Sequence, residues 1–407
     1  MKNPTSPFST DQFNHIVSFE EPSGKRMALE NLSPYEIINY FIEKKSKEIP
    51  IIDENKKLIQ RISRPSFSKQ NIIKEIESKS PARIGFAGGG SDFTDYLSLG
   101  NEGHLLSCAI ELFATCKLKI LSSKKIIIIN KNLNHDIQES SFEELQKNNN
   151  SNLIIEILKF LSPDFGFHLE LQTDFPLGSG LGGSSAVTMS ILSAFNELQS
   201  KKWTDLELIQ ISYLCERILF KNSGGWQDQY ITASGGLKEI FLNSNHQSIK
   251  PVSSDKYILD DLAEHLIITY TNISRDSGAV LNEQRRDLIS NKRLLDSIAQ
   301  SKSLVPKMKK VLESKDLKEF SKLLKDSGEI KRSLYSDNFP IELDEIYNKA
   351  IELGASSGKL LGAGAGGHFL FFVDKDKKKS ILDELNKLNY PSKEVFISDK
   401  GIQNIIK

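Results

Sequence analysis

One short segment, Pro176 to Ala186 (PLGSGLGGSSA), constrains the fold of this chain more than any other. Four of its eleven residues are glycines, which let backbone N–H groups turn toward one ligand because no Cβ stands in the way. A helix is predicted to begin near Gly183 and to run through SSAVTMSILSAFNEL, with Val187 and Ile191 on its apolar face. Backbone donors in front of a helix N-terminus form an anion site, so the segment predicts a phosphate-binding loop.

Two better-known phosphate-binding folds do not fit this loop. The chain has no GxxxxGK[ST] here, which excludes a P-loop NTPase. A GxGxxG does occur at Gly178 to Gly183, but no following strand carries the acidic residue that a dinucleotide fold places about 20 residues later. Taken alone, a Gly/Ser-rich turn is a structural loop more often than a ligand site, so its interpretation depends on the rest of the chain.

Composition indicates an ordinary globular protein with two domains. The 407 residues are 39% hydrophobic and 26% charged. Lysine plus arginine and aspartate plus glutamate both number 53, so no overall basic field would gather nucleic acid or a membrane surface. Partners must therefore be inferred from individual sites.

The compartment is predicted to be the cytoplasm. Cys108, Cys116 and Cys215 lie among apolar neighbours without metal-ligand spacing, which favours buried reduced thiols. The isolated histidines give no metal pattern either. The longest aliphatic run, 126–129, is far shorter than the roughly 20 residues of a membrane span, and the N-terminus lacks the apolar region of a secretion signal.

Residues 1–75 differ from the rest and are predicted to form an extension. They are polar, and within them a helix in SPYEIINYFIEKKSKE, a strand in IPIID and a turn at 54–55 are predicted. This stretch resembles one half of a CBS module; a family-specific extension is the alternative.

Downstream, strands and helices mix in a way that favours two α+β domains, 76–248 and 249–407, over a doubly wound sheet. Strands are predicted at 126–130, at 167–171, in HLIITYT and in HFLFFV. Helices are predicted around 206–220, from about 277 to 334, and at 341–353.

Three motifs in a fixed order give the chain a family resemblance. They are PARIGFAGGGSDFTDY (81–96), PLGSGLGGSSA, and KLLGAGAGGHFLFF (359–372). Together they resemble the GHMP kinases, the family of galactokinase, homoserine kinase and mevalonate kinase. FAGGGSD, GGWQDQYITASGG, SRDSGAVLNEQ and EIKRSL are similar to the D-glycero-D-manno-heptose 7-phosphate kinases within it. The resemblance implies the two-domain α+β GHMP fold, with a ribosomal protein S5 domain 2-like first domain and a ferredoxin-like second domain.

The resemblance also implies the ligands, ATP and Mg²⁺, and the residues that hold them. Ser185 and Glu216 match the family's Mg²⁺ ligands, and hard oxygen donors suit that ion; a solvated helix carboxylate is the alternative for Glu216. Ser184 and Ser185 could instead cap the helix. The residues predicted to bind the nucleotide are Pro176, Gly178, Ser179, Gly180, Leu181, Gly182, Gly183, Ser184, Ser185 and Ala186.

Catalysis is assigned by the resemblance to Asp228 and Arg83. The carboxylate would orient or deprotonate the reacting hydroxyl, and the guanidinium would keep the carboxylate ionised. Asp92 would accept hydrogen bonds from sugar hydroxyls, cap the next helix, or both. A sugar phosphate also needs basic residues, for which Arg275, Lys331 and Arg332 are candidates. The full set predicted to contact the acceptor is Gly89, Gly90, Ser91, Asp92, Gly225, Gln227, Arg275, Lys331, Arg332, Gly364 and Gly366.

Three functions are therefore in competition. The first is transfer of phosphate from ATP to the C1 hydroxyl of heptose 7-phosphate, for nucleotide-activated heptose and cell-surface polysaccharide. The second is a fucokinase-like enzyme or another sugar 1-kinase, and the third is a sugar sensor or scaffold without turnover. A small-molecule sugar or sugar phosphate is the expected partner, and a homodimer is one candidate assembly.

Overall fold

The structure is a computed structural model of the whole chain, and it is described over most of its length. The turn predicted at 54–55 and the run SRDSGAVLNEQ, with Arg275, lie outside the described residues. The described residues are 34–43, 46, 48–52, 58–67, 75–132, 135–139, 141–147, 152–243, 247–253, 255–273, 291–334, 339–362, 364 and 366–407.

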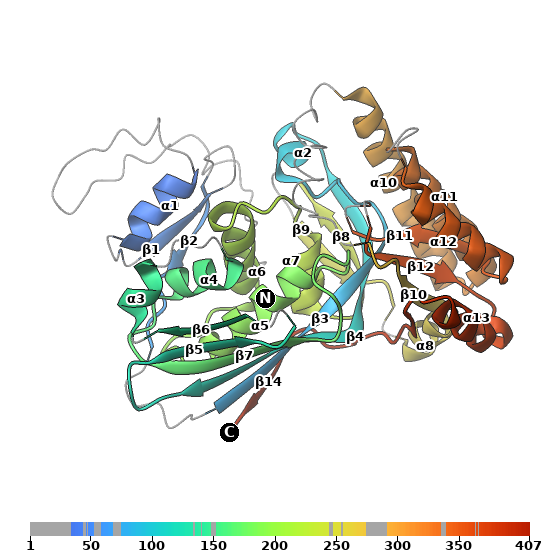
Figure 1. The fold of residues 1–407 in the computed structure, drawn as a ribbon. Coiled ribbons are helices and arrows are strands. Elements are labelled where there is room, and N and C mark those ends of the chain that lie inside the picture. The colour runs from blue at the N-terminus through green and yellow to red at the C-terminus, as the bar shows by residue number, and fades with distance from the viewer. Residues whose placement is uncertain are drawn as a thin grey trace.

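A large mixed sheet forms the base of the first half of the molecule (Figure 1). Its strands run in the order β14-β3-β4-β7-β5-β6, with β8 added on β4 and β9 on β8. All neighbours are antiparallel except β5 and β7. The strands are β3 (Glu75–Ala87), β4 (Gly103–Ile120), β5 (Ile126–Asn130), β6 (His135–Glu139), β7 (Phe167–Thr173), β8 (Leu237–Leu242), β9 (Gln247–Pro251) and β14 (Gln403–Ile406).

Helices pack on this sheet around one buried helix, α5 (Gly183–Asn196). Every residue of α5 from Ser185 to Asn196 is buried, and α5 contacts both β3 and β4. A helix that is apolar or small on all sides belongs inside a domain, which explains its weak amphipathic pattern. The neighbouring helices are α2 (Thr94–Ser98), α3 (Phe142–Lys147), α4 (Leu153–Leu161), α6 (Asp205–Tyr213), a π-helix (Leu214–Leu219) and α7 (Gln227–Ser234).

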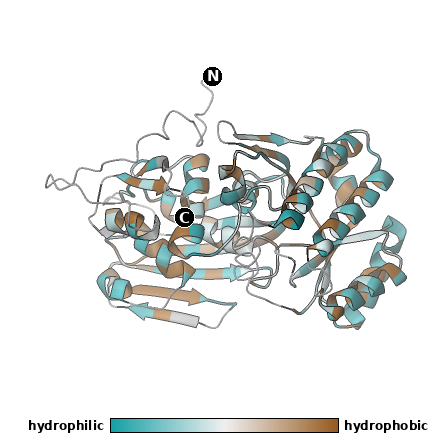
Figure 2. Ribbon diagram, turned by 90° about the horizontal axis from the view of Figure 1, so that it is seen from above, coloured by the Kyte–Doolittle hydropathy of each residue, from teal (hydrophilic) through white to brown (hydrophobic). Residues whose placement is uncertain are grey.

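A second, antiparallel sheet organises the other half, in the order β11-β12-β10-β13. Its helices show teal outward and brown inward faces in Figure 2, as expected for helices with one side on a core. The strands are β10 (Leu266–Tyr270), β11 (Ser357–Leu360), β12 (His368–Phe372) and β13 (Ser392–Glu394), and the helices are α8 (Lys256–Glu264), α10 (Lys292–Glu313), α11 (Leu317–Ser333), α12 (Ile341–Glu352) and α13 (Lys375–Lys387).

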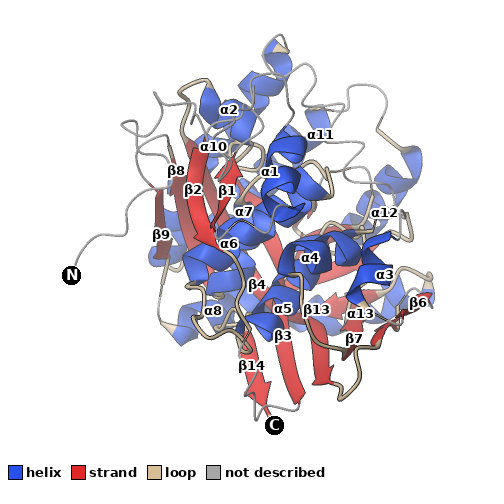
Figure 3. Cartoon of the chain, turned by 90° about the vertical axis from the view of Figure 1, so that its left-hand side faces the viewer, coloured by secondary structure: helices blue, strands red, loops and turns tan. Residues whose placement is uncertain are grey.

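The α+β class predicted from the sequence is confirmed, with three differences in detail. The helix predicted at 206–220 continues beyond α6 as a π-helix. The long helical run ends at Glu313 and restarts at Leu317, because Lys315 has a positive φ of 60° and Asp316 caps the second helix. The last strand, β14, pairs with β3, so the end of the chain lies in the first sheet (Figure 3).

The described helix and strands between residues 34 and 63 pack on the first half of the molecule. The helix and strand predicted there are confirmed as α1 (Pro34–Glu43) and β1 (Glu48–Ile52), and β2 (Leu58–Ser63) pairs with β1. Ile38 and Ile49 belong to the same hydrophobic core as α5, and α1 contacts the π-helix. Similarity to a CBS half module stays a prediction.

This packing predicts that α1 unfolds together with the first domain. Ile38 is fully buried, so Ile38→Ala should lower the free energy of unfolding by roughly 2–5 kcal/mol. Urea denaturation followed by tryptophan fluorescence measures the change, since both tryptophans lie outside the N-terminal segment. The exposed Glu48→Ala variant should stay within about 0.5 kcal/mol. An unchanged transition for Ile38→Ala would show that α1 folds on its own.

Candidate active site

The glycine loop between β7 and α5 has the backbone that an anion site requires. Gly178, Gly180 and Gly182 have positive φ values of 72°, 79° and 71°, a region that L side chains rarely adopt. Left-handed residues in a tight loop allow successive backbone N–H groups to point toward one anion. Gly182 caps α5 without a side-chain hydrogen bond, which leaves N–H groups at the helix start for a ligand.

The loop at 362–367 supports the glycine loop from the second sheet. The two approach so closely that a Cβ on Gly362 would lie 2.4 Å from the Cα of Gly180. A Cβ on Gly367 would lie equally close, 2.4 Å, to the backbone oxygen of Ser179. That oxygen also accepts hydrogen bonds from the backbone N–H of His368, at 3.0 Å, and from its Nδ1, at 2.9 Å. Glycine is required on both sides because backbone contacts backbone.

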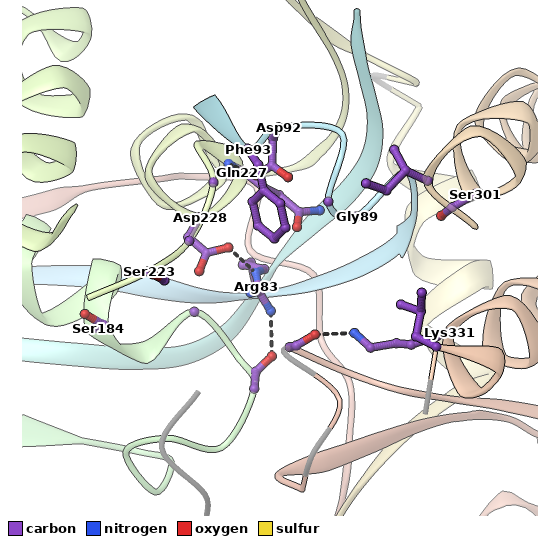
Figure 4. Close-up of a pocket in the computed structure, with 18 of the residues that line it drawn as sticks. Arg83, Gly89, Asp92, Phe93, Ser184, Ser223, Gln227, Asp228, Ser301 and Lys331 are labelled. Atoms are coloured by element: carbon purple, nitrogen blue, oxygen red, sulfur yellow. Dashed lines mark hydrogen bonds and ion pairs between the residues drawn. The ribbon is translucent and has the colours of Figure 1, made fainter. Parts of the chain in front are cut away.

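A cavity of about 440 Å³ opens beside the glycine loop (Figure 4). Residues from both halves of the molecule line it, including α10 and α11 of the second half. Of the predicted residues, it brings together Arg83, Gly89, Gly90, Asp92, Gly178, Ser179, Gly180, Gly182, Gly183, Ser184, Gly225, Gln227, Asp228 and Lys331.

Arg83 and Asp228 form an ion pair at the wall of this cavity. Arg83 projects from β3, and its Nε donates to Oδ1 of Asp228 at 2.7 Å. Its Nη1 donates to the backbone oxygen of Gly180 at 2.6 Å. Figure 4 shows the guanidinium between the carboxylate and the glycine loop. This ion pair fixes the Asp228 carboxylate next to the expected phosphates.

Glu216 lies behind the loop, on the π-helix, and is fully buried. Its Oε2 accepts from the hydroxyls of Ser184, at 2.6 Å, and Ser185, at 3.0 Å. Its Oε1 accepts from Ser212 at 3.1 Å and Gln229 at 2.9 Å. The structure therefore joins the predicted metal ligands Ser185 and Glu216, with Ser184 as the member that lines the cavity.

Asp92 is held against the loop that precedes α7. Its Oδ2 accepts from the backbone N–H of Gln227 at 2.8 Å. Burial raises the pKa of the Asp92 carboxyl, and the nearby Asp228 raises it further, whereas the hydrogen bond from Gln227 and the charge of Arg217 lower it. A carboxyl with a raised pKa in a cavity is a candidate ligand-binding group.

Two lysines bring further positive charge to the cavity. Lys331 of α11 donates to the backbone oxygen of Gly362, and burial with the nearby Arg83 lowers its pKa to about 7. Lys359 of β11 donates to the backbone oxygen of Phe86 at 2.7 Å, and burial lowers its pKa well below the ordinary value. Because burial disfavours these charges, an anionic ligand would stabilise them.

Several predicted residues lie elsewhere. Arg332 faces away, where it forms an ion pair with Asp344 and its guanidinium lies 4.9 Å from the ring centroid of Phe339. Ser91 is buried and donates to the backbone oxygen of Gly88 at 2.7 Å. The other described residues that were predicted but do not line the cavity are Pro176, Leu181, Ser185, Ala186, Glu216, Gly364 and Gly366.

Local sequence patterns do not single out Arg217, Lys359 or the apolar wall of the cavity. Arg217 follows Glu216 directly, and Lys359 is the first residue of the third motif, so each lies inside a segment that resembles the family. The wall comes from α10 and from Phe93, and includes Leu294 and Ile298. No local signal distinguishes such residues from ordinary core.

The part of the chain that the structure describes contains no helix long and apolar enough to cross a membrane. It also contains no cluster of three or more His, Cys, Asp or Glu side chains that could hold a metal ion by themselves.

Comparison with known proteins identifies the family. Residues 152–236 match the family described as GHMP kinases N terminal domain, and residues 308–391 match GHMP kinases C terminal. A D-glycero-alpha-D-manno-heptose 7-phosphate kinase from Campylobacter jejuni is 30% identical over 82% of this chain and 99% of its own length. The chain belongs to the GHMP kinase family, whose members use ATP. It is a sugar kinase of that family, a phosphotransferase with an alcohol group as acceptor.

Other relatives extend the comparison. An L-fucokinase/L-fucose-1-P guanylyltransferase from Bacteroides fragilis is 28% identical over 84% of this chain, which spans 40% of that longer protein. The crystal structure of a D-glycero-D-manno-heptose 1-phosphate kinase from Bacteroides thetaiotaomicron superposes with a TM-score of 0.66, at 26% identity, over 81% of this chain and 98% of its own. A Lactococcus lactis galactokinase structure, at 20% identity and a TM-score of 0.61 over 81% of this chain and 95% of its own, shares the fold.

The close packing of Gly225 against Asp92 leaves no room for a side chain at position 225. A Cβ there would lie 2.0 Å from Oδ2 of Asp92, so Gly225→Ala should push the carboxylate away from Gln227 and lower stability by about 1–3 kcal/mol. Gly89→Ala is the matched control, since its Cβ would meet nothing within 4 Å. Thermal unfolding of the two variants should differ accordingly, and equal melting temperatures would contradict the observed packing.

The buried ring of His368 should make the contact between the glycine loop and the loop at 362–367 sensitive to acid. Burial lowers its pKa to about 4, so the neutral ring donates to Ser179 in the folded protein. Unfolded histidine has a pKa of about 6.5 and binds more protons between these values, so the free energy of unfolding should fall as the pH falls from 6.5 to 4, by up to about 3 kcal/mol. His368→Asn keeps a donor but does not titrate, and should show a smaller fall in urea titrations at pH 7, 5.5 and 4.5. An equal fall in both proteins would assign the acid sensitivity to other groups.

Proposed function

We propose that this chain is an ATP-dependent sugar 1-kinase that phosphorylates the anomeric hydroxyl of D-glycero-D-manno-heptose 7-phosphate. The observation that carries the proposal is the ion pair of Arg83 and Asp228, tied to the glycine loop through the backbone oxygen of Gly180. It holds a candidate base beside a phosphate-binding loop. Phosphoryl transfer needs this proximity of nucleophile and donor.

The donor is assigned to the glycine loop. Three left-handed glycines and the uncapped start of α5 suit the phosphates of ATP. The described lining of the cavity includes four basic side chains, from Arg83, Arg217, Lys331 and Lys359, against the two carboxyl groups of Asp92 and Asp228. An anionic ligand would stabilise the charged forms of the two buried lysines, so this lining favours a ligand with several negative charges.

Mg²⁺ is assigned to Ser184, Ser185 and Glu216. The hydroxyls of Ser184 and Ser185 lie 2.6 Å and 3.0 Å from Oε2 of Glu216, so three hard oxygen donors that suit Mg²⁺ lie together and would hold the ion. When bound, the ion would neutralise charge on the phosphates.

The reaction follows from what the residues of this chain can do. The Asp228 carboxylate accepts the proton of the sugar hydroxyl, which attacks the γ-phosphorus as the bond to ADP breaks. Arg83 fixes the position of Asp228 through their ion pair and adds positive charge near the transferred group. Asp92 and the backbone around Gly89 and Gly225 hold the sugar.

The acceptor is inferred from relatives and from charge. The Campylobacter jejuni protein, whose full length is matched, is described as a heptose 7-phosphate kinase. Lys331 and Lys359 line the cavity, and a second phosphate would stabilise their charged forms, which burial disfavours. The product would be the 1,7-bisphosphate, on the route to nucleotide-activated heptose and polysaccharide in the cytoplasm.

A fucokinase-like activity is the second candidate. It is favoured by the apolar wall of Phe93, Leu294 and Ile298, which suits the methyl group of a deoxysugar better than a phosphate. ADP release measured with heptose 7-phosphate, free heptose, fucose and galactose separates the candidates. Turnover of free sugars and of no 7-phosphate would refute the first proposal, and absence of turnover with every acceptor would favour a sensor.

The assignment of Asp228 predicts a loss of rate. Asp228→Asn should lower kcat by about 10²–10⁴-fold, because the amide cannot accept the proton as the carboxylate does. The dissociation constant for AMP-PNP, measured by calorimetry, should change little. Asp261→Asn, at an exposed ion pair with Lys375, is the matched control and should retain full activity. Normal turnover by Asp228→Asn would show that another group acts as the base.

A further inference from the structure

Arg217 is a buried cation for which the described residues supply few acceptors. The residue is 7% exposed, and its Nε has no hydrogen-bond partner. Its Nη2 donates to the backbone oxygen of Gly225 over a long 3.4 Å. A guanidinium carries five N–H donors, and burying one without acceptors is costly.

The neighbouring carboxylate does not satisfy this charge. Nη1 of Arg217 lies 3.6 Å from Oε2 of Glu216, beyond good hydrogen-bond distance. The two oxygens of Glu216 already accept from Ser184 and Ser185 on one side and from Ser212 and Gln229 on the other. A carboxylate has about four acceptor positions, so Glu216 is fully engaged.

The π-helix explains how adjacent residues serve two different loops. Its wider turn is shown by the hydrogen bond from the backbone N–H of Phe220 to the oxygen of Cys215, at 2.9 Å. Glu216 reaches the serines of the glycine loop, and Arg217 reaches the loop before α7. Such turns inside helices are frequently found at functional sites.

The glycines of that loop admit the guanidinium. A Cβ on Gly224 would lie 2.5 Å from Cζ of Arg217, closer than real Cβ contacts allow. A Cβ on the next residue, Gly225, would lie 2.0 Å from Oδ2 of Asp92. Arg217 and Asp92 therefore pack against consecutive glycines, and both line the cavity.

We propose that Arg217 binds oxygens of a phosphoryl group inside the cavity. The guanidinium fork matches phosphate oxygens in bidentate fashion. Arg83 already donates hydrogen bonds to Asp228 and Gly180, whereas Nε of Arg217 has no hydrogen-bond partner. The inference rests on the proposed function only in requiring a phosphorylated ligand.

Two sources can supply this phosphoryl group, the nucleotide or the sugar phosphate. Oε2 of Glu216 lies near both the glycine loop and Arg217, at 2.6 Å from the Ser184 hydroxyl and 3.6 Å from Nη1 of Arg217. On its other side Arg217 contacts Gly225, which also packs on Asp92. Arg217 thus lies between the predicted donor loop and the predicted acceptor residues.

The test measures ligand affinity in matched variants. Arg217→Gln removes the charge, Arg217→Lys keeps the charge without the fork, and Arg332→Gln removes a comparable arginine outside the cavity. Calorimetry would use Mg²⁺ with AMP-PNP, heptose 7-phosphate and inorganic tripolyphosphate as separate probes. Arg217→Gln should weaken at least one probe by about tenfold or more, Arg217→Lys should recover part of the loss, and Arg332→Gln should match the wild type.

The pattern of loss identifies the source. Weaker binding of AMP-PNP and tripolyphosphate would assign Arg217 to the nucleotide, and weaker binding of heptose 7-phosphate alone would assign it to the acceptor. A purely structural arginine would instead lower the melting temperature and leave all affinities unchanged, which would overturn the proposal.

Gly224→Ala provides an independent test that retains the arginine. Its Cβ should displace the guanidinium and weaken the same probe as Arg217→Gln, and this variant decides if Arg217→Gln does not fold. Unchanged affinity in Gly224→Ala, or a wild type that binds none of the probes, would also overturn the proposal. Wild-type ADP release with the sugar panel tests the proposed function separately, since affinity for AMP-PNP and tripolyphosphate is measurable whichever sugar is the acceptor.

Discussion

The site depends on the placement of one side chain, Arg83. Its backbone N–H donates to the oxygen of Leu181 at 2.9 Å, and its guanidinium bonds to both Gly180 and Asp228. Strand β3, the glycine loop and helix α7 are thereby held in one arrangement. Two charge-assisted hydrogen bonds in a largely buried site are stronger than neutral ones and fix geometry. The rest of the cavity is built around this junction.

The second half of the molecule contributes by backbone contact. Gly362 and Gly367 lie against the glycine loop at distances that no side chain permits, and His368 adds two hydrogen bonds to Ser179. These contacts place α11, with Lys331, at the cavity. A sugar kinase assembled from two sheets can thus keep its phosphate loop in shape through close backbone contact between glycines of the two halves.

Local patterns predicted much of the fold and part of the site. The strand at 126–130 and the helix beginning at Gly183 were predictable because apolar spacing and a glycine boundary act over a few residues. Glu216 could be predicted as a site residue because its segment resembles the family. Arg217 was not, because its direction depends on a π-turn that periodicity does not reveal. Arg332 was selected for its charge, yet α11 turns it toward Asp344 while Lys331 faces the cavity.

By itself the sequence determined an anion-binding glycine loop in front of a helix, an α+β chain, and three motifs in the order of the GHMP kinases. Only the tertiary structure decided which charges meet. Arg83, Asp228 and Lys359 are brought together by sheet pairing and by glycine contacts between segments far apart in the chain. Burial then decides how far each of these groups is removed from water, and burial is a property of the packed molecule rather than of any local segment.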